Sequence, residues 1–158
     1  MSNFVIKEYL RLKMPSEDLS ISDQQRILLA LDSLGYKNIH FPLTIIRKLY
    51  PLCRNAGFDI TVTLVHREYD WVVTNVEAGD TTATLYGLAV DYGSTTILMQ
   101  LIDLNTGNVI LEEKEENGQI QYGTDILTRI IYSMENETHV KDLQKATIET
   151  FHAIMKRL

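Results

Sequence analysis

Two largely apolar stretches, residues 84–91 and 95–103, are joined by a turn of only a few residues, and this joint constrains the fold more than any other feature. Both stretches have the length and composition of strands, so the sequence predicts a strand, a tight turn and a second strand. The polar residues of the joint are Asp91, Gly93, Ser94, Thr95 and Thr96. A carboxylate therefore ends the first strand, and a glycine with three consecutive hydroxyl side chains follows it.

This set of residues can hold a phosphate chain and its magnesium ion. Gly93 lets the backbone approach an anion, and the N–H groups and hydroxyls of the turn can donate hydrogen bonds to it. Asp91 can hold Mg²⁺, directly or through water. The same residue types also form ordinary hairpin turns. Residues 87–96 alone therefore leave a phosphate site and a plain turn as alternatives.

The composition restricts the class of protein and its partners. Of 158 residues, 45% are hydrophobic and 23% are charged, which predicts one globular domain or two small ones. A net charge of −6 argues against a surface for nucleic acid or an anionic membrane. No apolar run reaches the roughly 20 residues that span a bilayer, and the first residues do not resemble a signal peptide. We therefore expect no nucleic-acid partner, no membrane association and a cytoplasmic location.

Cys53 is the only cysteine of the chain. It cannot form an internal disulfide, a cysteine-ligated zinc site or a protein-ligated iron–sulfur cluster. We expect it to be a small buried side chain near the end of a helix.

Residues 1–80 predict a small β-α-α-β-β module. Apolar alternation predicts a strand at 4–13, and two β-rich segments at 59–65 and 70–76 predict a hairpin.

Two helices are expected between these strands. Ser20 or Ser22 can cap the first, which Gly35 ends, and the second spans about 43–55. Pro51 lies inside the second pattern, so we expect a kink there or an end just before it.

Residues 81–158 predict a second module, which follows a short polar boundary at 77–82. After the two strands described above, a tight turn at 105–107 leads to a third strand at 109–114. Two helices follow, near 124–134 and 140–158, each with apolar residues at helical spacing.

The order of strands and helices in the second module resembles the opening of a ribonuclease-H-like subdomain, which sugar kinases, actin and heat-shock chaperone ATPases share. More specifically, residues 86–96 and 117–130 resemble the ATP-dependent reductive activators of corrinoid proteins. Residues 14–27 and 70–80 resemble the start and the end of that family's linker. Two positions depart from the family pattern, because Tyr92 replaces a small aliphatic residue and Gly118 often replaces proline.

The resemblance implies an α/β (α+β) fold, with the β-α-α-β-β linker module followed by a partial ribonuclease-H-like, actin-like ATPase subdomain of order β-β-β-α-α. Family members pair an iron–sulfur ferredoxin domain with a linker and an ATPase region. They use Mg-ATP to return the Co(II) corrinoid protein of a methyltransferase system to Co(I). The chain has neither the ferredoxin domain nor the second half of the nucleotide cleft, so we expect a fragment with little or no turnover alone.

The resemblance also implies roles for single residues. Asp91 would be the catalytic carboxylate on the magnesium side, and the phosphates would bind Gly93, Ser94, Thr95 and Thr96. Four more residues could face the cleft: Gln119, Tyr122, Asp125 and Arg129. For the first two, packing of the loop is an equal alternative, and for the last two a surface ion pair.

Two other functions remain open on sequence grounds. The chain could be a non-catalytic interaction module whose phosphate loop is vestigial, or a fragment of a sugar or acyl kinase. In addition, the strand at 85–91 is expected to lack a partner on one edge. We expect a homo-oligomer to cover this edge, and pairing with residues 71–76 is the alternative.

Overall fold

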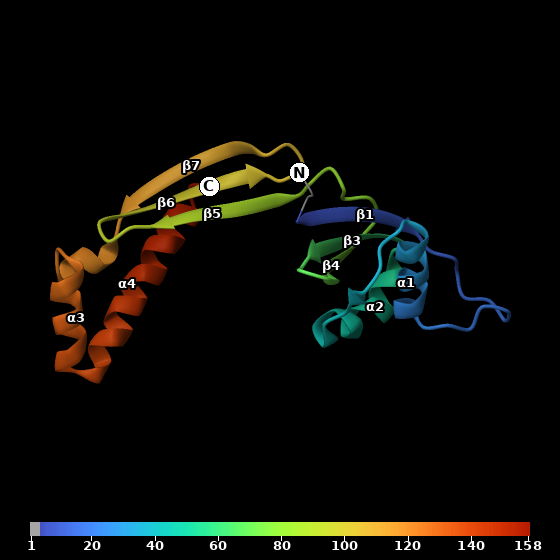
Figure 1. Cartoon of the computed structure of the whole chain (residues 1–158), viewed down its shortest axis with the longest axis horizontal. Coiled ribbons are helices and arrows are strands. Elements are labelled where there is room, and N and C mark those ends of the chain that lie inside the picture. Colours follow the sequence, from blue (N-terminus) through green and yellow to red (C-terminus); the bar gives the residue numbers. More distant parts are fainter. Residues whose placement is uncertain (1–3) are drawn as a thin grey trace. The chain divides into compact units, whose positions relative to one another are not determined.

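The computed structural model describes residues 4–158, and the chain separates into two compact units, residues 1–85 and residues 86–158. Each unit has its own sheet and its own helices (Figure 1). The expected α+β class is confirmed.

The first unit contains a four-stranded sheet of order β1-β3-β4-β2. β1 (Val5–Arg11), β3 (Asp59–His66) and β4 (Trp71–Ala78) are antiparallel neighbours. The sequence predicted the three strands and the hairpin of β3 with β4, but not the pairing of β1 with β3. β2 (Ile39–His40) pairs in parallel with β4 and was not predicted, because two residues are too short to show a strand period.

The two helices of this unit pack with the sheet around one core. α1 (Asp23–Ser33) begins after Ser22, whose Oγ accepts a hydrogen bond from the N–H of Gln25. α2 (Leu43–Asn55) continues through Pro51, so the alternative of an end before this residue is wrong. The fully buried core side chains come from both helices and two strands: Ile27, Leu31, Cys53, Ile60, Val62, Leu64 and Val73.

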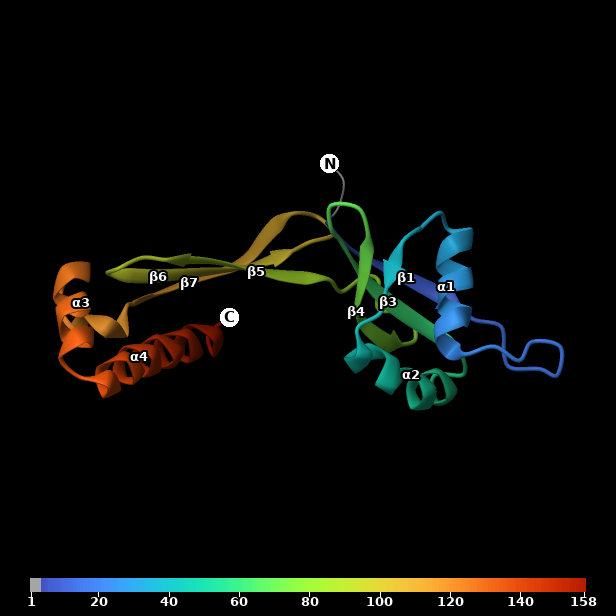
Figure 2. The same ribbon diagram turned by 60° about the horizontal axis from the view of Figure 1, so that its bottom comes forward.

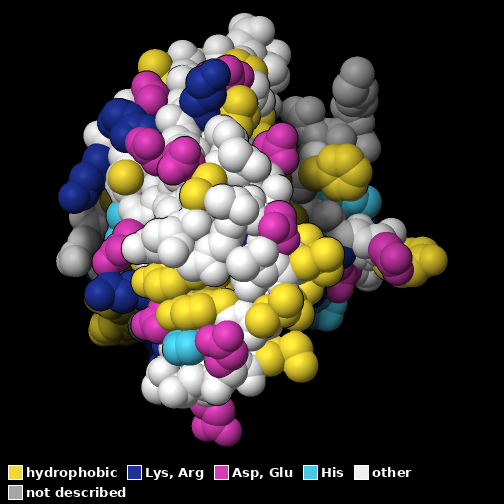
Figure 3. Space-filling view, turned by 90° about the vertical axis from the view of Figure 1, so that its left-hand side faces the viewer, with side chains coloured by type: hydrophobic (Ala, Val, Ile, Leu, Met, Phe, Trp, Pro, Cys, Tyr) yellow, Lys and Arg dark blue, Asp and Glu magenta, His cyan; other side chains and the backbone are white. Residues whose placement is uncertain are grey.

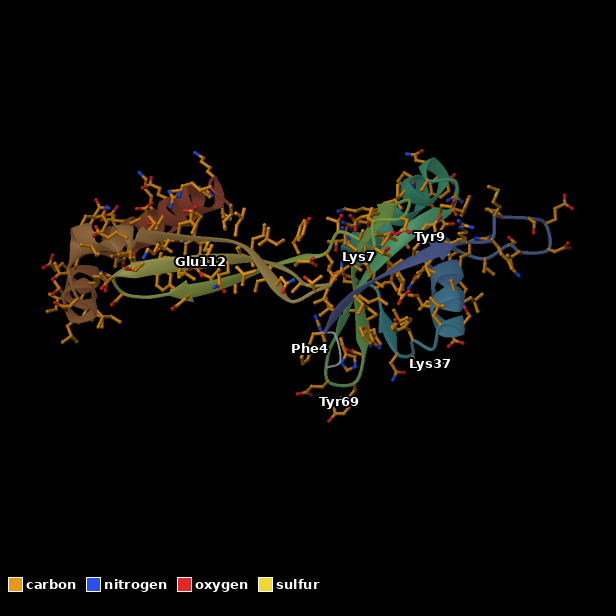
Figure 4. All side chains as sticks on the ribbon, turned by 90° about the horizontal axis from the view of Figure 1, so that it is seen from above. Phe4, Lys7, Tyr9, Lys37, Tyr69 and Glu112 are labelled. Carbon is orange, nitrogen blue, oxygen red and sulfur yellow. The ribbon has the colours of Figure 1, made fainter. Side chains whose placement is uncertain are left out.

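Lys7 and Trp71 each connect separate segments of this unit. Lys7 Nζ, on β1, lies 2.7 Å from Glu77 Oε2 and donates to Thr81 Oγ1 at 3.1 Å, which ties β1 to the segment after β4 (Figure 4). Trp71 packs edge-on against Tyr36, with ring centroids 5.2 Å apart, and lies 4.6 Å from the ring of His66.

The second unit contains an antiparallel sheet of three consecutive strands. β5 (Tyr86–Tyr92), β6 (Thr96–Asp103) and β7 (Asn108–Glu116) lie in the order β5-β6-β7. β5 begins two residues later than expected. The turn between β6 and β7 contains Gly107 at φ +77°, a conformation that favours glycine.

Three helical segments follow the sheet. They are the 3₁₀ helix η1 (Gly118–Tyr122), α3 (Ile126–Glu135) and α4 (Glu137–Met155). α4 packs on one face of the sheet, where Ile154 joins the buried Ile97 and Met99 of β6 (Figure 2). It begins and ends three residues earlier than the sequence predicted. The early start follows from Asn136, whose Oδ1 caps the helix by accepting from the N–H of Thr138.

Part of the apolar surface of this unit stays uncovered. Within residues 4–158, β5 pairs only with β6, and residues 71–76 are already paired with β3 and β2, so the predicted open edge is present. The apolar face of α3 is exposed as well, at Ile126, Leu127, Ile131 and Met134. Figure 3 shows hydrophobic side chains gathered on the side where α3 lies in Figure 1. No helix in the described part of the chain is both long and apolar enough to cross a membrane.

Candidate phosphate-binding turn and the groove beside it

The turn between β5 and β6 closes so tightly that residue 93 must be glycine. The N–H of Gly93 donates to the carbonyl of Thr96 at 3.0 Å. A Cβ atom on Gly93 would lie 2.6 Å from that carbonyl oxygen, closer than any ordinary contact. The sequence indicated glycine because an anion needs room, and the structure adds that the turn itself needs it.

Asn117 fixes the carbonyl groups of this turn. Its side chain is completely buried, and its Nδ2 donates to the carbonyl of Gly93 at 2.9 Å. Its backbone N–H donates to the carbonyl of Thr95 at 2.8 Å, and its Oδ1 accepts from the N–H of Gln119. Sequence reasoning missed Asn117, although it begins the 117–130 segment. The signal was weak because the residue acts on a turn 24 positions away.

The three hydroxyls of the turn have no partner among the described residues. In the described part of the chain, no hydrogen-bond partner is found for the hydroxyl of Ser94, Thr95 or Thr96. With the carbonyl groups of Gly93 and Thr95 held by Asn117, the turn presents three hydroxyls that can donate hydrogen bonds to whatever approaches. This polarity suits an anion.

The register of the hairpin divides the predicted residues between two faces of the sheet. Asp91 pairs with Leu98 and Tyr92 with Ile97, and neighbouring residues of a strand point to opposite faces. Asp91, which is exposed, therefore lies on the same face as Thr96, two residues before Leu98. Tyr92 lies on the other face, the one that α4 covers.

Tyr92 connects the turn to α4. Its hydroxyl and Thr147 Oγ1 share a hydrogen bond of 3.0 Å, and its ring lies edge-on to Phe151 at 6.0 Å. The departure from a small aliphatic residue at this position thus provides a polar and an aromatic contact with the last helix.

Gln119 and Arg129 hold the segment 117–123 in place. Gln119 Nε2 donates to the carbonyl of Leu143 at 3.0 Å and to Thr147 Oγ1 at 2.9 Å. Arg129 is only 5% exposed, and its Nε donates to the carbonyl of Gly123 at 2.7 Å. Arg129 Nη1 lies 3.4 Å from Gln119 Oε1, so the hydrogen bond between these two side chains is long and weak.

Asp125 and Tyr122 have local partners. Asp125 caps α3, because its two carboxylate oxygens accept from the backbone N–H and the hydroxyl of Thr128. These hydrogen bonds, that from the N–H first, hold the pKa of Asp125 below its usual value. The ring of Tyr122 stacks on Tyr132 at 5.0 Å. Within residues 4–158, Asp125 and Arg129 form no ion pair with each other.

Three of the predicted residues meet in one groove of about 250 Å³. They are Ser94, Gln119 and Arg129, and the remaining walls consist of Tyr92, Ile126, Ile130, Ser133 and Leu143. The groove therefore lies on the α4 side of the sheet, and Asp91 and Thr96 lie on the opposite face.

A magnesium ion at Asp91 would not be surrounded by a cluster of acidic or histidine side chains. Among residues 4–158, no three His, Cys, Asp or Glu side chains gather around a position that could hold a metal. This fits Mg²⁺, which commonly takes one or two carboxylates and completes its coordination with phosphate oxygens and water.

Comparison with known proteins gives consistent matches to both units. Residues 1–83 match the RACo linker region, and residues 86–158 match the RACo middle region. The corrinoid activation enzyme RamQ from Eubacterium limosum is 25% identical over 87 residues, which are 55% of this chain and 15% of that protein. A solved structure of a reductive activator for a corrinoid iron–sulfur protein matches 99% of this chain with a TM-score of 0.84 and 26% identity, and this chain covers 25% of it.

Proposed function

Since this chain belongs to the RACo family, with the linker and middle regions of that family, we propose that it is part of an ATP-dependent reductive activator of corrinoid proteins. The chain spans only 15% and 25% of the two relatives, so the activity is proposed for a longer protein that contains these 158 residues. In that protein, residues 81–158 would begin an actin-like ATPase subdomain.

The proposed partner is the corrinoid protein of a methyltransferase system, whose cobalt gains one electron and passes from Co(II) to Co(I). The names of both relatives support a corrinoid partner. The electron must come from a carrier outside this chain, because a single cysteine cannot ligate an iron–sulfur cluster.

We propose that the turn binds the phosphates of Mg-ATP. The observation that carries this proposal is the polarity of the turn: Asn117 holds two of its carbonyl groups, and three hydroxyls have no partner in the described residues. Thr96 would donate to a phosphate on the face where Asp91 holds the metal, directly or through water. Magnesium would neutralise phosphate charge there.

Replacement of Asp91 by asparagine in the longer protein tests this role. The change removes one charge and almost no volume, so the fold is kept, and both Mg-ATP hydrolysis and the ATP-dependent reduction of the corrinoid protein should fall. Asp18→Asn, an exposed carboxylate in a turn of the first unit, is the matched control. Unchanged turnover in Asp91→Asn would show that the metal role is wrong.

Two further measurements separate the alternative functions. A non-catalytic interaction module predicts that neither this chain nor the longer protein binds Mg-ATP in a titration. A sugar or acyl kinase predicts phosphoryl transfer that depends on an acceptor. If the longer protein reactivated the corrinoid protein without ATP, the proposed ATP-dependent activation would be wrong.

A further inference from the structure

We propose that the groove beside the turn binds a phosphate ion or phosphate group through the guanidinium of Arg129, at a site separate from the magnesium side of the turn. The inference begins with the charge of Arg129. Its side chain is 5% exposed, yet in residues 4–158 its hydrogen-bond acceptors are two neutral groups, the carbonyl of Gly123 and Gln119 Oε1. A buried charge normally has a counter-charge, because removing it from water is costly.

Within the described residues, the nearest carboxylate in sequence, that of Asp125, forms no direct ion pair with the guanidinium. Hydrogen bonds from Thr128 are the main causes that lower the pKa of Asp125, and its attraction to Arg129 is the last of those causes. Asp125 lies one helical turn before Arg129, but both of its oxygens accept hydrogen bonds from Thr128. Asp125 therefore stabilises the start of α3 and leaves the guanidinium without an ion pair.

Arg26, the other buried arginine of the described residues, has acceptors for both of its terminal nitrogens, although its Nε has no hydrogen-bond partner. Arg26 is 4% exposed, and its Nη1 and Nη2 donate to the carbonyl groups of Lys13, Met14, Leu19 and Ile21. Asp23 lies 3.9 Å from its Nε. Arg129 has fewer acceptors and no carboxylate.

In the described residues, the two nitrogens of Arg129 with a weak or missing hydrogen bond are Nη1 and Nη2. They form the end of the guanidinium that oxyanions recognise. Its Nε is fixed by the short bond to Gly123, whereas Nη1 has only the 3.4 Å contact with Gln119. Nη2 is buried and has no hydrogen-bond partner in the described residues. Two parallel N–H groups of an arginine match two oxygens of a phosphate or carboxylate. An oxyanion in the groove would replace Gln119 Oε1 and bind both nitrogens.

The walls of the groove favour phosphate. The hydroxyl of Ser94, which has no partner in the described part of the chain, lines the same groove and adds a donor, and no carboxylate lines it. A phosphate can accept from the hydroxyl with one oxygen and from the guanidinium with two others. To bind Nη1, the phosphate has to displace Gln119 Oε1 from its 3.4 Å contact, while Gln119 Nε2 can keep its hydrogen bonds to Leu143 and Thr147. The site is distinct from Asp91 because the two lie on opposite faces of the sheet.

The inference can be tested on this chain alone, with inorganic phosphate as the probe and without nucleotide or magnesium. We expect phosphate to shift the side-chain Nε–Hε NMR signal of Arg129, at a phosphate concentration that leaves the Arg157 signal unchanged. Arg129→Gln should weaken phosphate binding at least about ten-fold, and Arg129→Lys should restore only part of it, because lysine keeps the charge without the paired donors. Arg157→Gln is the control, since Arg157 is already paired with Glu113 and Glu115.

Ser94→Ala provides a second variant on an exposed turn position, in case Arg129→Gln disturbs the fold, and it should also weaken binding. Acetate at the same ionic strength tests which kind of oxyanion the groove binds. A shift of the Arg129 signal with acetate and none with phosphate would overturn the assignment to phosphate. No shift with either ion would overturn the site altogether. Phosphate binding by a chain whose longer form does not bind Mg-ATP would keep this inference and refute the proposed function.

Discussion

Asn117 Nδ2 reaches back across 24 positions to the carbonyl of Gly93, at 2.9 Å and with the asparagine side chain completely buried. This bond joins the end of β7 to the turn between β5 and β6, so the shape of the turn depends on a residue outside the hairpin. The turn is therefore held in one shape by the protein itself, so the phosphate binding proposed for it would cost less entropy than binding to a mobile turn.

Asn117→Ala should destabilise the second unit by about 1–3 kcal/mol, because it removes the hydrogen bonds that this buried side chain forms with the carbonyl of Gly93 and the N–H of Gln119. Urea unfolding followed by far-ultraviolet circular dichroism measures the change. Asn108→Ala, at an exposed strand position, should stay within about 0.5 kcal/mol of the unmodified chain. Equal effects of the two changes on stability would show that the hydrogen bonds of the Asn117 side chain do not stabilise the turn.

Gly93→Ala should force the turn to open, since the new Cβ would lie 2.6 Å from the carbonyl oxygen of Thr96. A cost of about 1–3 kcal/mol in the free energy of unfolding is expected from such overpacking. Ser94→Ala, the next residue and exposed, is the control for stability. A Gly93→Ala chain as stable as this control would show that the turn tolerates a side chain.

The stability of the second unit should depend on the ionisation of Asp125. Hydrogen bonds from the N–H and then the hydroxyl of Thr128 lower the pKa of this carboxyl in the folded chain. The carboxylate therefore stabilises the fold above its unfolded pKa of about 3.9, and this contribution is lost as the pH falls through the lower, folded pKa. In acid unfolding curves, Asp125→Asn should lose this part of the pH dependence and still cap α3. An unchanged profile would contradict the assignment.

Thr96→Val in the longer protein should weaken the binding of Mg-ATP by about 1.5–3 kcal/mol, because it removes a hydrogen bond to a charged group and keeps the shape of the side chain. Titration calorimetry gives the change. Thr84→Val, which precedes β5, should bind as the unmodified protein does. Loss of binding in both variants would point to a general effect on the unit.

The open edge of β5 should make this chain associate with itself. Unpaired strand groups beside exposed apolar side chains such as Leu88, which is 47% exposed, recruit further strands. Light scattering at tens of micromolar should give a mass above that of one chain, and Leu88→Lys should lower it. Leu29→Lys, on the surface of α1, is the control. A strictly monomeric mass for the unmodified chain would refute this expectation.

Local patterns in the sequence were sufficient for most elements of the fold. Ser22 and Gly35 mark the ends of α1, and Gly107 marks the turn before β7, because caps and left-handed turns depend on the residues at the position itself. The helix that contains Pro51 was harder, since packing outweighs the lost hydrogen bond there.

Features that depend on distant residues could not be predicted from those patterns. The run of glutamates near the end of β7 continues the strand instead of ending it, because residues 112–116 stay paired with β6. Arg157 forms ion pairs with Glu113 and Glu115 there. Glu112 accepts a hydrogen bond from Gln100 on the neighbouring strand (Figure 4). The groove was only partly foreseen: Ser94, Gln119 and Arg129 were candidates, but nothing local indicated that they would meet on the face opposite Asp91.

The placement of Trp71 between Tyr36 and His66 gives the chain a built-in optical label. Trp71 is the only tryptophan of the sequence and belongs to the first unit, whereas the second unit carries tyrosines such as Tyr92 and Tyr132. Excitation at the red edge of the absorption band selects indole emission and therefore follows the first unit alone. The first unit also contains tyrosines, Tyr36 among them, so tyrosine emission reports on both units, whereas indole emission isolates the first.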